Sequence, residues 1–299
     1  MSHVTAFACY RSRVTNSPNS ATDARSLYLD LLKGTLTGAI SEDNDSILGG
    51  VRTQGSVTLK RKIANAVGVQ ANKLGLEIAV KKPYDASARA QGLDWPVRSE
   101  SMIGLARMNN IQMAIESVIA DGVEGDIIET GVWRGGATIF MRGVLKAYGV
   151  TDRKVWVADS FEGLPAPDAA RYPADAGDKL FTQTGLAVGL QTVKHNFERY
   201  GLLDDQVEFL VGWFKDTLPT APIEKIAVAR LDGDMYESTI DAIAALYPKL
   251  QPGGFLLIDD YGSHASQCGA AIHDYRKEHG ITEEIVQIDP FGAYWRKSL

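Results

Sequence analysis

After about residue 98 the chain alternates short apolar runs with amphipathic stretches. Five runs have the length of strands, at residues 126–129, 155–159, 207–211, 227–232 and 255–260. Apolar residues at helical spacing lie between them, as at Leu190, Val193, Phe197 and Tyr200. Such alternation is typical of βαβ units, and it predicts an α/β fold with a mostly parallel sheet and helices on both faces. Residues 284–288 and 294–296 are further strand candidates that would close this sheet as a hairpin.

The front of the chain has a weaker pattern. Apolar residues within 24–40 and 57–81 indicate mainly helical structure, and a turn-rich passage with two prolines follows at 82–98. We therefore predict two parts. Residues 1–86 form a mainly helical N-terminal extension with a flexible leader, and residues 87–299 form the α/β domain.

Composition excludes several classes of protein. The 299 residues are 45% hydrophobic and 23% charged, which suits a globular chain with a full core. A formal net charge of −6 gives no general attraction to nucleic acid or to an anionic membrane. Cys9 and Cys268 cannot make a disulfide framework, and the apolar runs are too short to span a membrane. We expect a cytoplasmic enzyme with neither kind of partner.

The ends of the predicted strands carry the candidate chemistry. In an open α/β sheet, ligands bind beyond the carboxyl ends of the strands. Four of the five strand ends carry carboxylates, and the residues at these ends are Glu129, Asp159, Gly212, Asp232 and the pair Asp259 and Asp260.

The turn after the first strand favours a cationic cofactor. Glu129 is followed by Gly131, and Gly135 and Gly136 open the next helix. A dinucleotide fingerprint needs glycine where Glu129 stands. A carboxylate there would repel a pyrophosphate but attract the ammonium group of S-adenosylmethionine. The alternative is that these glycines only permit close packing of strand and helix.

Two more positions suit such a cofactor. Asp159 ends the second strand about 20 residues after the glycine turn, where an acidic side chain typically binds a ribose. It could instead cap the turn that follows. Trp213, after the third strand, offers an aromatic surface for an adenine, although a tryptophan there could equally belong to the core.

The fourth and fifth strands end in a group of acids. If these strands are neighbours, Asp232 meets Asp259 and Asp260 at one sheet edge, where they would repel one another without a cation. Oxygen ligands suit a hard ion such as Mg²⁺ or Ca²⁺. Asp234 could join this group, or it could cap the helix from Ser238 instead. Adjacent residues of a strand face opposite sides of the sheet. Asp259 and Asp260 can therefore bind the same ion only if the strand has already turned.

A metal beside a sulfonium cofactor suits methyl transfer to oxygen. Metal coordination lowers the pKa of an alcohol hydroxyl, and a nearby carboxylate can take the proton. The methyl group then moves in line from sulfur to oxygen, and the protein mainly positions the two reactants. We therefore predict an O-methyltransferase that acts on a hydroxyl of a small molecule.

Several motifs resemble a known family. Residues 249–254, running into 255–260, resemble the post-helix motif of class I methyltransferases. Five segments are similar to the macrocin O-methyltransferase family, namely residues 128–136, 158–165, 212–214, 231–238 and 294–296. The resemblance extends from about residue 93 to the C-terminus, with a weaker echo at 26–33. The family includes deoxysugar O-methyltransferases of macrolide and aminocoumarin antibiotic biosynthesis.

This resemblance implies a Rossmann-like class I methyltransferase fold, S-adenosylmethionine, Mg²⁺, a glycoside as hydroxyl acceptor, and a homo-oligomer. It assigns the metal to Asp232, Asp259 and Asp260, with Asp232 also as general base. It assigns the cofactor to Met102, Glu129, Gly131, Asp159 and Ser160, with Ile103 beside Met102. Residues 168–189 correspond to a variable lid that binds the acceptor.

Other functions fit fewer of these residues. A metal-dependent glycosyltransferase could use the Asp232-Gly233-Asp234 motif, but it would leave Glu129 and the pair Asp259 and Asp260 without a role. A nucleotide-dependent oxidoreductase is disfavoured by the broken glycine fingerprint, and a non-catalytic binding module is a third alternative. Of the histidines, His264 could lie in the acceptor pocket, whereas His195 is expected at the surface.

Overall fold

The computed structural model describes residues 24–43, 45–48, 58–262 and 267–299. Its main sheet has seven strands in the order β5-β4-β3-β6-β7-β9-β8. The strands are β3 (Asp126–Thr130), β4 (Val155–Asp159), β5 (Val207–Val211), β6 (Ile226–Leu231), β7 (Leu250–Ile258), β8 (Val286–Gln287) and β9 (Ala293–Arg296). The first five are parallel, and β9 pairs antiparallel with β7 and with β8. The predicted parallel sheet and its closing hairpin are both confirmed.

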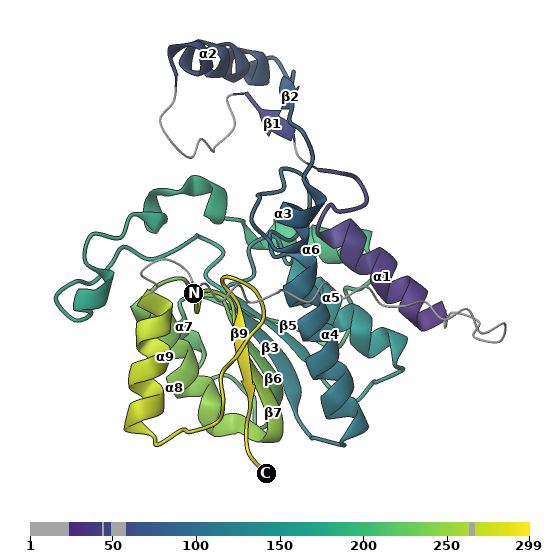
Figure 1. Ribbon diagram of the computed structural model, residues 1–299, viewed down its shortest axis with the longest axis vertical. Coiled ribbons are helices and arrows are strands. Elements are labelled where there is room, and N and C mark those ends of the chain that lie inside the picture. Colours follow the sequence, from purple (N-terminus) through teal and green to yellow (C-terminus); the bar gives the residue numbers. More distant parts are fainter. Residues whose placement is uncertain (1–23, 44, 49–57, 263–266) are drawn as a thin grey trace, which may run out of the picture.

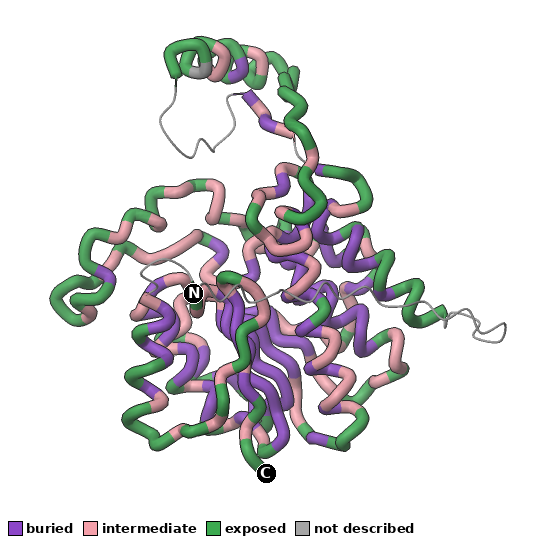
Figure 2. The backbone as a smooth tube through the Cα atoms, in the orientation of Figure 1, coloured by how far each residue is buried: buried purple, intermediate pink, exposed green. Residues whose placement is uncertain are grey.

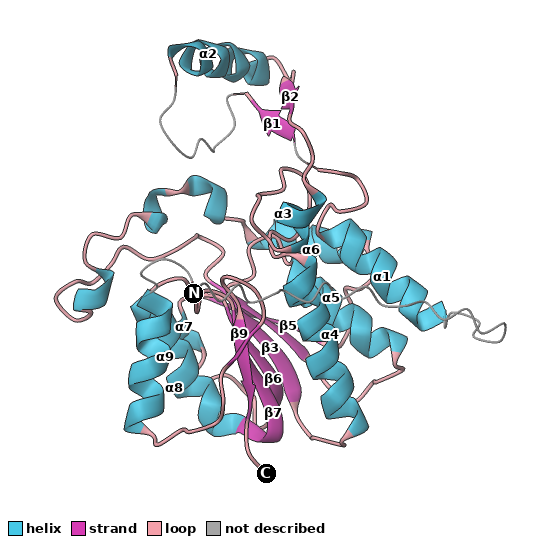
Figure 3. Cartoon of the chain, in the orientation of Figure 1, coloured by secondary structure: helices cyan, strands magenta, loops and turns pink. Residues whose placement is uncertain are grey.

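Helices cover both faces of this sheet (Figures 1 and 3). One face carries α1 (Ala24–Leu36), α4 (Leu105–Ala120), α5 (Gly136–Ala147) and α6 (Leu190–Arg199). The other carries α7 (Phe214–Thr217), α8 (Tyr236–Leu246), the short 3-10 helix η4 (Tyr247–Lys249) and α9 (Gln267–Glu278). Each face has its own apolar core, and Figure 2 shows the strands between them as buried. None of the helices within the described ranges is both long and apolar enough to pass through a membrane.

The first described helix of the N-terminal segment, α1, packs onto the sheet domain. In α1, Leu29 and Leu36 are buried, and Leu32 lies so close to Gly143 of α5 that a Cβ there would come within 2.4 Å of it. The helix ends at Leu36 rather than near residue 40, because Gly38 adopts a left-handed φ of 72°, a conformation that ends helices.

Beyond α1 the chain leaves the sheet domain and returns to it. β1 (Asp45–Ile47) and β2 (Ala79–Lys81) form a small antiparallel pair, α2 (Leu59–Lys73) lies beside them, and α3 (Ala86–Ala90) follows. Figure 1 shows α2 projecting away from the main sheet. The helical character of the described part of the N-terminal segment is confirmed. The predicted flexible leader lies outside the described residues, and the division at residue 86 stays a prediction.

The order of the parallel strands determines where a ligand can bind. The chain moves outward from β3 to β4 and β5 on one side, and then returns to β6 and β7 on the other side of β3. A crevice opens at the carboxyl ends of strands where the direction of winding changes in this way. In this sheet that position lies between the carboxyl ends of β3 and β6.

Candidate active site

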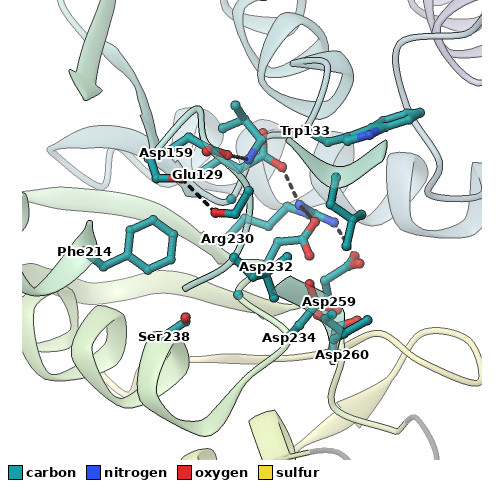
Figure 4. A pocket seen from close by; sticks show the side chains of 18 of the residues that line it. Glu129, Trp133, Asp159, Phe214, Arg230, Asp232, Asp234, Ser238, Asp259 and Asp260 are labelled. Atoms are coloured by element: carbon teal, nitrogen blue, oxygen red, sulfur yellow. Dashed lines mark hydrogen bonds and ion pairs between the residues drawn. The ribbon is translucent and has the colours of Figure 1, made fainter. Parts of the chain in front are cut away.

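A pocket lies at the carboxyl ends of β3, β4, β6 and β7 (Figure 4). The residues that the sequence assigned to the cofactor or the metal line it, and they are Met102, Glu129, Gly131, Asp159, Ser160, Trp213, Asp232, Asp259 and Asp260. The lid contributes Leu180, Gln183 and Leu186 to the same lining. The structure thus brings the proposed cofactor residues and the proposed metal residues into one cavity.

The turn after β3 requires glycine for two physical reasons. Gly131 has a φ of 84°, and a Cβ on it would stand 1.7 Å from the carbonyl oxygen of Asp232. A Cβ on Gly136, at the start of α5, would meet the backbone of Glu100 at 2.6 Å. The close packing that the sequence left as an alternative is therefore present, and Gly131 and Gly136 also line the pocket.

Glu129 has partners within the protein. Its side chain is 1% exposed, and its carboxylate accepts hydrogen bonds from the Thr138 hydroxyl and the Arg230 guanidinium. Burial raises the pKa of Glu129 above its ordinary value, and the attraction of Arg230 opposes that rise. A carboxylate oxygen can accept more than one hydrogen bond, so these contacts leave acceptor capacity facing the pocket.

Asp159 and Ser160 hold the loops around them. One oxygen of Asp159 accepts from the Val132 N–H at 2.8 Å, and the other accepts from the Phe161 N–H at 2.7 Å. The Ser160 hydroxyl donates to the Gly163 carbonyl at 2.8 Å. Asp159 therefore does cap the turn that follows, as the sequence alternative held, and it connects that turn to the glycine turn. Its ribose-binding role stays a prediction.

Met102 and Trp213 border the pocket as partly exposed apolar side chains. Ile103 beside Met102 is buried in the core of the α4 face. Trp213 belongs to neither core cluster, so its side chain is available to a ligand rather than used in the protein interior. Its contact with an adenine remains untested.

The predicted acid group forms because β6 and β7 are neighbours. Leu231 pairs with Ile258, so the residues that follow them meet at one edge of the sheet. β7 ends at Ile258, and both following acids therefore lie beyond the pleat of the strand, where successive side chains can face one point. Ligand oxygens of Asp232, Asp259 and Asp260 lie within 4.8 Å of one another, a donor set that fits a hard divalent cation.

Electrostatics makes this acid group dependent on positive charge. Burial and neighbouring carboxylates raise the pKa values of Asp232 and Asp260 well above those of ordinary aspartates. Asp259 behaves in the opposite way. The nearby guanidinium groups of Arg107 and Arg230 lower its pKa despite burial.

These two arginines were missed in the sequence analysis. Arg230 donates to Asp232 at 2.8 Å and also to Asp259, while Arg107 of α4 donates to Asp259 at 2.7 Å. Arg107 also donates to Asp289 at 2.9 Å. The protein thus supplies part of the positive charge that was expected from an ion alone. The signal for Arg230 was present, because a strand places residues 230 and 232 on the same face.

Asp234 lies in the pocket but does not cap the next helix. Burial and the nearby Asp259 and Asp178 carboxylates raise its pKa from 3.8 to about 6. The first turn of α8 is capped by Asp175 of the lid, which accepts from the N–H groups of Tyr236 and Glu237. The capping alternative for Asp234 is therefore wrong, because the lid places another carboxylate at that helix end.

The two histidines can be placed in part. His195 lies on α6 and is exposed, with Glu198 3.5 Å away, as the sequence predicts for a surface residue. His264 lies outside the residues that the structure describes.

The fold and the pocket together define a class of protein. A parallel sheet in this order, extended by an antiparallel hairpin and covered by helices on both faces, is the class I methyltransferase fold. The solved structure titled "Structure of the O-methyltransferase NovP" superposes with a TM-score of 0.77 at 42% identity, over 92% of this chain and 100% of that one.

Comparison of sequences identifies the family. Residues 25–297 match the family model described as Macrocin-O-methyltransferase (TylF), and the chain belongs to that family. It is 49% identical to the 8-demethyl-8-(2,3-dimethoxy-alpha-L-rhamnosyl)-tetracenomycin-C 4'-O-methyltransferase of Streptomyces olivaceus, over 92% of this chain and 94% of the relative. It is 47% identical to the mycinamicin III 3''-O-methyltransferase of Micromonospora griseorubida, over 91% and 96%. The protein is accordingly an O-methyltransferase.

Family membership also decides between the alternatives. The glycosyltransferase alternative rested on the Asp232-Gly233-Asp234 motif, and the comparisons give it no support. In the structure this motif is the loop between β6 and α8, and it lines the pocket together with the glycine turn.

Proposed function

We propose that this O-methyltransferase transfers the methyl group of S-adenosylmethionine to a sugar hydroxyl of a glycosylated natural product, with assistance from Mg²⁺. The acceptor class follows from the relatives, whose names describe methylation of a rhamnosylated tetracenomycin and of mycinamicin III. The one observation that carries the proposal is the position of the acid group, which shares a single pocket with the glycine turn.

The cofactor half of the pocket suits a cationic ligand with an adenosyl group. Glu129 and Asp159 are carboxylates that border it, and Gly131 of the glycine turn lines it as well. The N-terminus of α5 begins at Gly136 beside these groups. We propose that Glu129 attracts the ammonium of the cofactor, that Asp159 and Ser160 hold its ribose, and that Met102 and Trp213 cover its apolar surfaces.

The metal half suits activation of an alcohol. A divalent cation, when bound, lowers the pKa of a hydroxyl, and S-adenosylmethionine provides an electrophilic methyl group. We propose that Asp232, Asp259 and Asp260 hold the cation and that Asp232 also takes the proton of the acceptor hydroxyl. Arg107 and Arg230 hold Asp259 by hydrogen bonds from two sides, and Leu180, Gln183 and Leu186 of the lid line the same pocket.

A screen with isotope-labelled S-adenosylmethionine tests the proposal. We expect mass spectrometry to find one labelled methyl group on the sugar of a deoxysugar glycoside, and none on the matching aglycone. Asp232→Asn should lower kcat about 100-fold or more while S-adenosylhomocysteine still binds, because the proton acceptor is lost and the cofactor half is intact. Methylation of the aglycone instead, or an unchanged kcat in the variant, would contradict the assignment.

A further inference from the structure

Three residues of the lid, which comprises residues 168–189, line the pocket: Leu180, Gln183 and Leu186. The regular structure of the lid consists of three single-turn 3-10 helices, η1 (Pro173–Asp175), η2 (Leu180–Thr182) and η3 (Thr184–Leu186). Figure 3 shows the rest of it as loop. So little regular structure cannot by itself hold a segment in one place, and its attachments to the body of the protein therefore determine its position.

One side chain of the lid is fully buried. Asp175 is 0% exposed, whereas Ala174 and Ala176 on either side of it are exposed. Its two carboxylate oxygens accept from the N–H groups of Tyr236 at 2.8 Å and Glu237 at 2.9 Å. These N–H groups belong to the first turn of α8, where no residue of the same helix can accept them. The helix cap is therefore provided by a residue about 60 positions away in the chain.

The residue that precedes α8 does not cap this helix end. The residue before the helix is Met235. Its side chain has no carboxylate or hydroxyl that could accept a hydrogen bond, and it makes no side-chain cap. A negative charge at this end of a helix is also favourable, because the N-terminus carries partial positive charge. Removal of Asp175 would leave two N–H groups without their acceptor in a buried place.

The capped helix end lies next to the proposed metal loop. Asp232 and Asp234 belong to the short loop that joins β6 to α8, and Tyr236 follows Asp234 by two residues. Asp234 has a left-handed φ of 56°, which is unfavourable for a residue with a Cβ, so the ends of the loop must hold it in place. The β6 end is fixed by the Asp232 N–H, which donates to the Thr130 carbonyl at 2.8 Å. Asp175 fixes the other end.

Further contacts attach the lid beside Asp175 and at its far end. The rings of Tyr172 and Tyr236 lie 5.8 Å apart. At the far end, the Trp133 indole N–H donates to the Gly185 carbonyl at 2.9 Å. Trp133 belongs to the glycine turn after β3, so the lid is attached to the cofactor half as well as to the metal half of the pocket.

We propose that Asp175 is a positioning residue: it latches the lid to α8 and, through that helix end, holds the loop from Asp232 to Asp234 in place. This inference rests on the proposed function, because it gives the loop its metal-binding role. Closure of the lid and ordering of the acid group are then one event. An open lid releases the cap of α8 and loosens the loop that carries Asp232.

Three variants separate this role from a general contribution to folding. Asp175→Ala removes both acceptors, whereas Asp175→Asn keeps one oxygen that can cap a helix. Asp168→Ala is the matched control, because the Asp168 carboxylate accepts from Arg171 within the lid at 3.2 Å. The lid contains its own protease sites, Arg171 and Lys179, both exposed. The readouts are the rate of tryptic cleavage after Lys179, and the affinity for Mg²⁺ alone in protein saturated with S-adenosylhomocysteine.

For Asp175→Ala we expect cleavage after Lys179 to be about five- to thirtyfold faster and Mg²⁺ binding to be weaker by a similar factor, since a lost cap corresponds to such a change in an equilibrium. Asp175→Asn should lie within about threefold of the wild type in both readouts. Asp168→Ala should match the wild type. A destabilised fold alone would lower the melting temperature and would speed tryptic cleavage throughout the protein, not only after Lys179.

Wild-type cleavage and Mg²⁺ affinity in Asp175→Ala would overturn the latch. So would an Asp175→Asn variant as impaired as the alanine variant. If the wild type itself binds no Mg²⁺, the metal part of the proposed function fails, and the role of Asp175 toward the acid loop fails with it. The tryptic readout is independent of catalysis, and it still decides whether Asp175 holds the lid.

Discussion

At the scale of single residues, the pocket is built on alternating charge. Glu129 pairs with Arg230 across β3 and β6, and Asp232 lies two positions further along the same face. Figure 4 shows Arg230 between Glu129 and the acid group. Its buried guanidinium contacts Glu129, Asp232 and Asp259, so one cation connects the proposed cofactor half with the proposed metal half.

Arg230→Met should destabilise the protein by about 3–5 kcal/mol, because it leaves buried carboxylates without their common partner. The free energy of unfolding in urea measures this loss. Arg142→Met is the matched control, since Arg142 is similarly buried but pairs with the partly exposed Asp204 away from the pocket. We expect a smaller loss there. Equal losses of stability in the two variants would mean that the contacts of Arg230 with the pocket carboxylates have no special role.

Asp234 should make stability depend on pH when no metal is present. Its pKa is about 6 in the folded protein, above the ordinary value of 3.8. The folded state therefore keeps a proton that the unfolded state has released, and this stabilisation is lost as the pH rises from about 4 through 6. In EDTA, the free energy of unfolding of the wild type should fall across this range relative to Asp234→Asn. Parallel profiles for the two proteins would show that Asp234 does not titrate there.

At the scale of elements, one glycine in the turn from β3 to α5 connects β3 with the ends of β4 and β6. Gly131 lies against the carbonyl oxygen of Asp232, and its N–H donates to the Ala158 carbonyl at 2.9 Å. The ends of β3, β4 and β6 therefore meet at this residue. A side chain at this position would push the glycine turn away from the loop that carries Asp232.

Gly131→Ala should impair both stability and cofactor binding. Its cost combines a left-handed backbone, about 1–2 kcal/mol, with overpacking of about 1–3 kcal/mol. Gly149→Ala is the control, because Gly149 has a φ of 67° and no atoms within 4 Å of an added Cβ. Calorimetry should show weak binding of S-adenosylhomocysteine to the first variant and unchanged binding to the second. Undiminished binding to Gly131→Ala would argue against a cofactor at this turn.

The sequence predicted the elements well where the pattern of apolar residues matches the burial of the element in the folded protein. The second and third strand candidates coincide with β4 and β5, because these strands are apolar and bounded by polar turns. The fourth and fifth end before their acids, at Leu231 and Ile258, although the N–H groups of Asp232 and Asp259 still donate to the neighbouring strands, at Thr130 and Leu231.

The partners of the charged residues could not be predicted in the same way. Arg107 reaches Asp259 only because α4 packs over β7, and Asp175 reaches α8 only through the path of the lid. Periodicity describes which face of an element is apolar. It does not show which distant element will lie against that face, so long-range charge pairs and caps appear only in the folded structure.

At the scale of the whole molecule, one pocket contains the residues of both halves of the proposed reaction. The glycine turn and β4 form the side that suits the cofactor, while β6 and β7 form the side with the acid group (Figure 4). The lid is attached to both sides, at Trp133 of the glycine turn and at α8. Methyl donor and acceptor oxygen would thereby be held in one enclosed space, which is the main requirement of an in-line transfer.

Metal dependence of turnover is the most direct test of this account. The enzyme is treated with EDTA, and methylation of the glycoside found in the screen is measured before and after Mg²⁺ is added back. We expect chelation to abolish turnover and Mg²⁺ to restore it in the wild type, while Asp260→Asn needs far more Mg²⁺ for the same rate. Full turnover in EDTA would contradict the central claim that Asp232, Asp259 and Asp260 form a metal site.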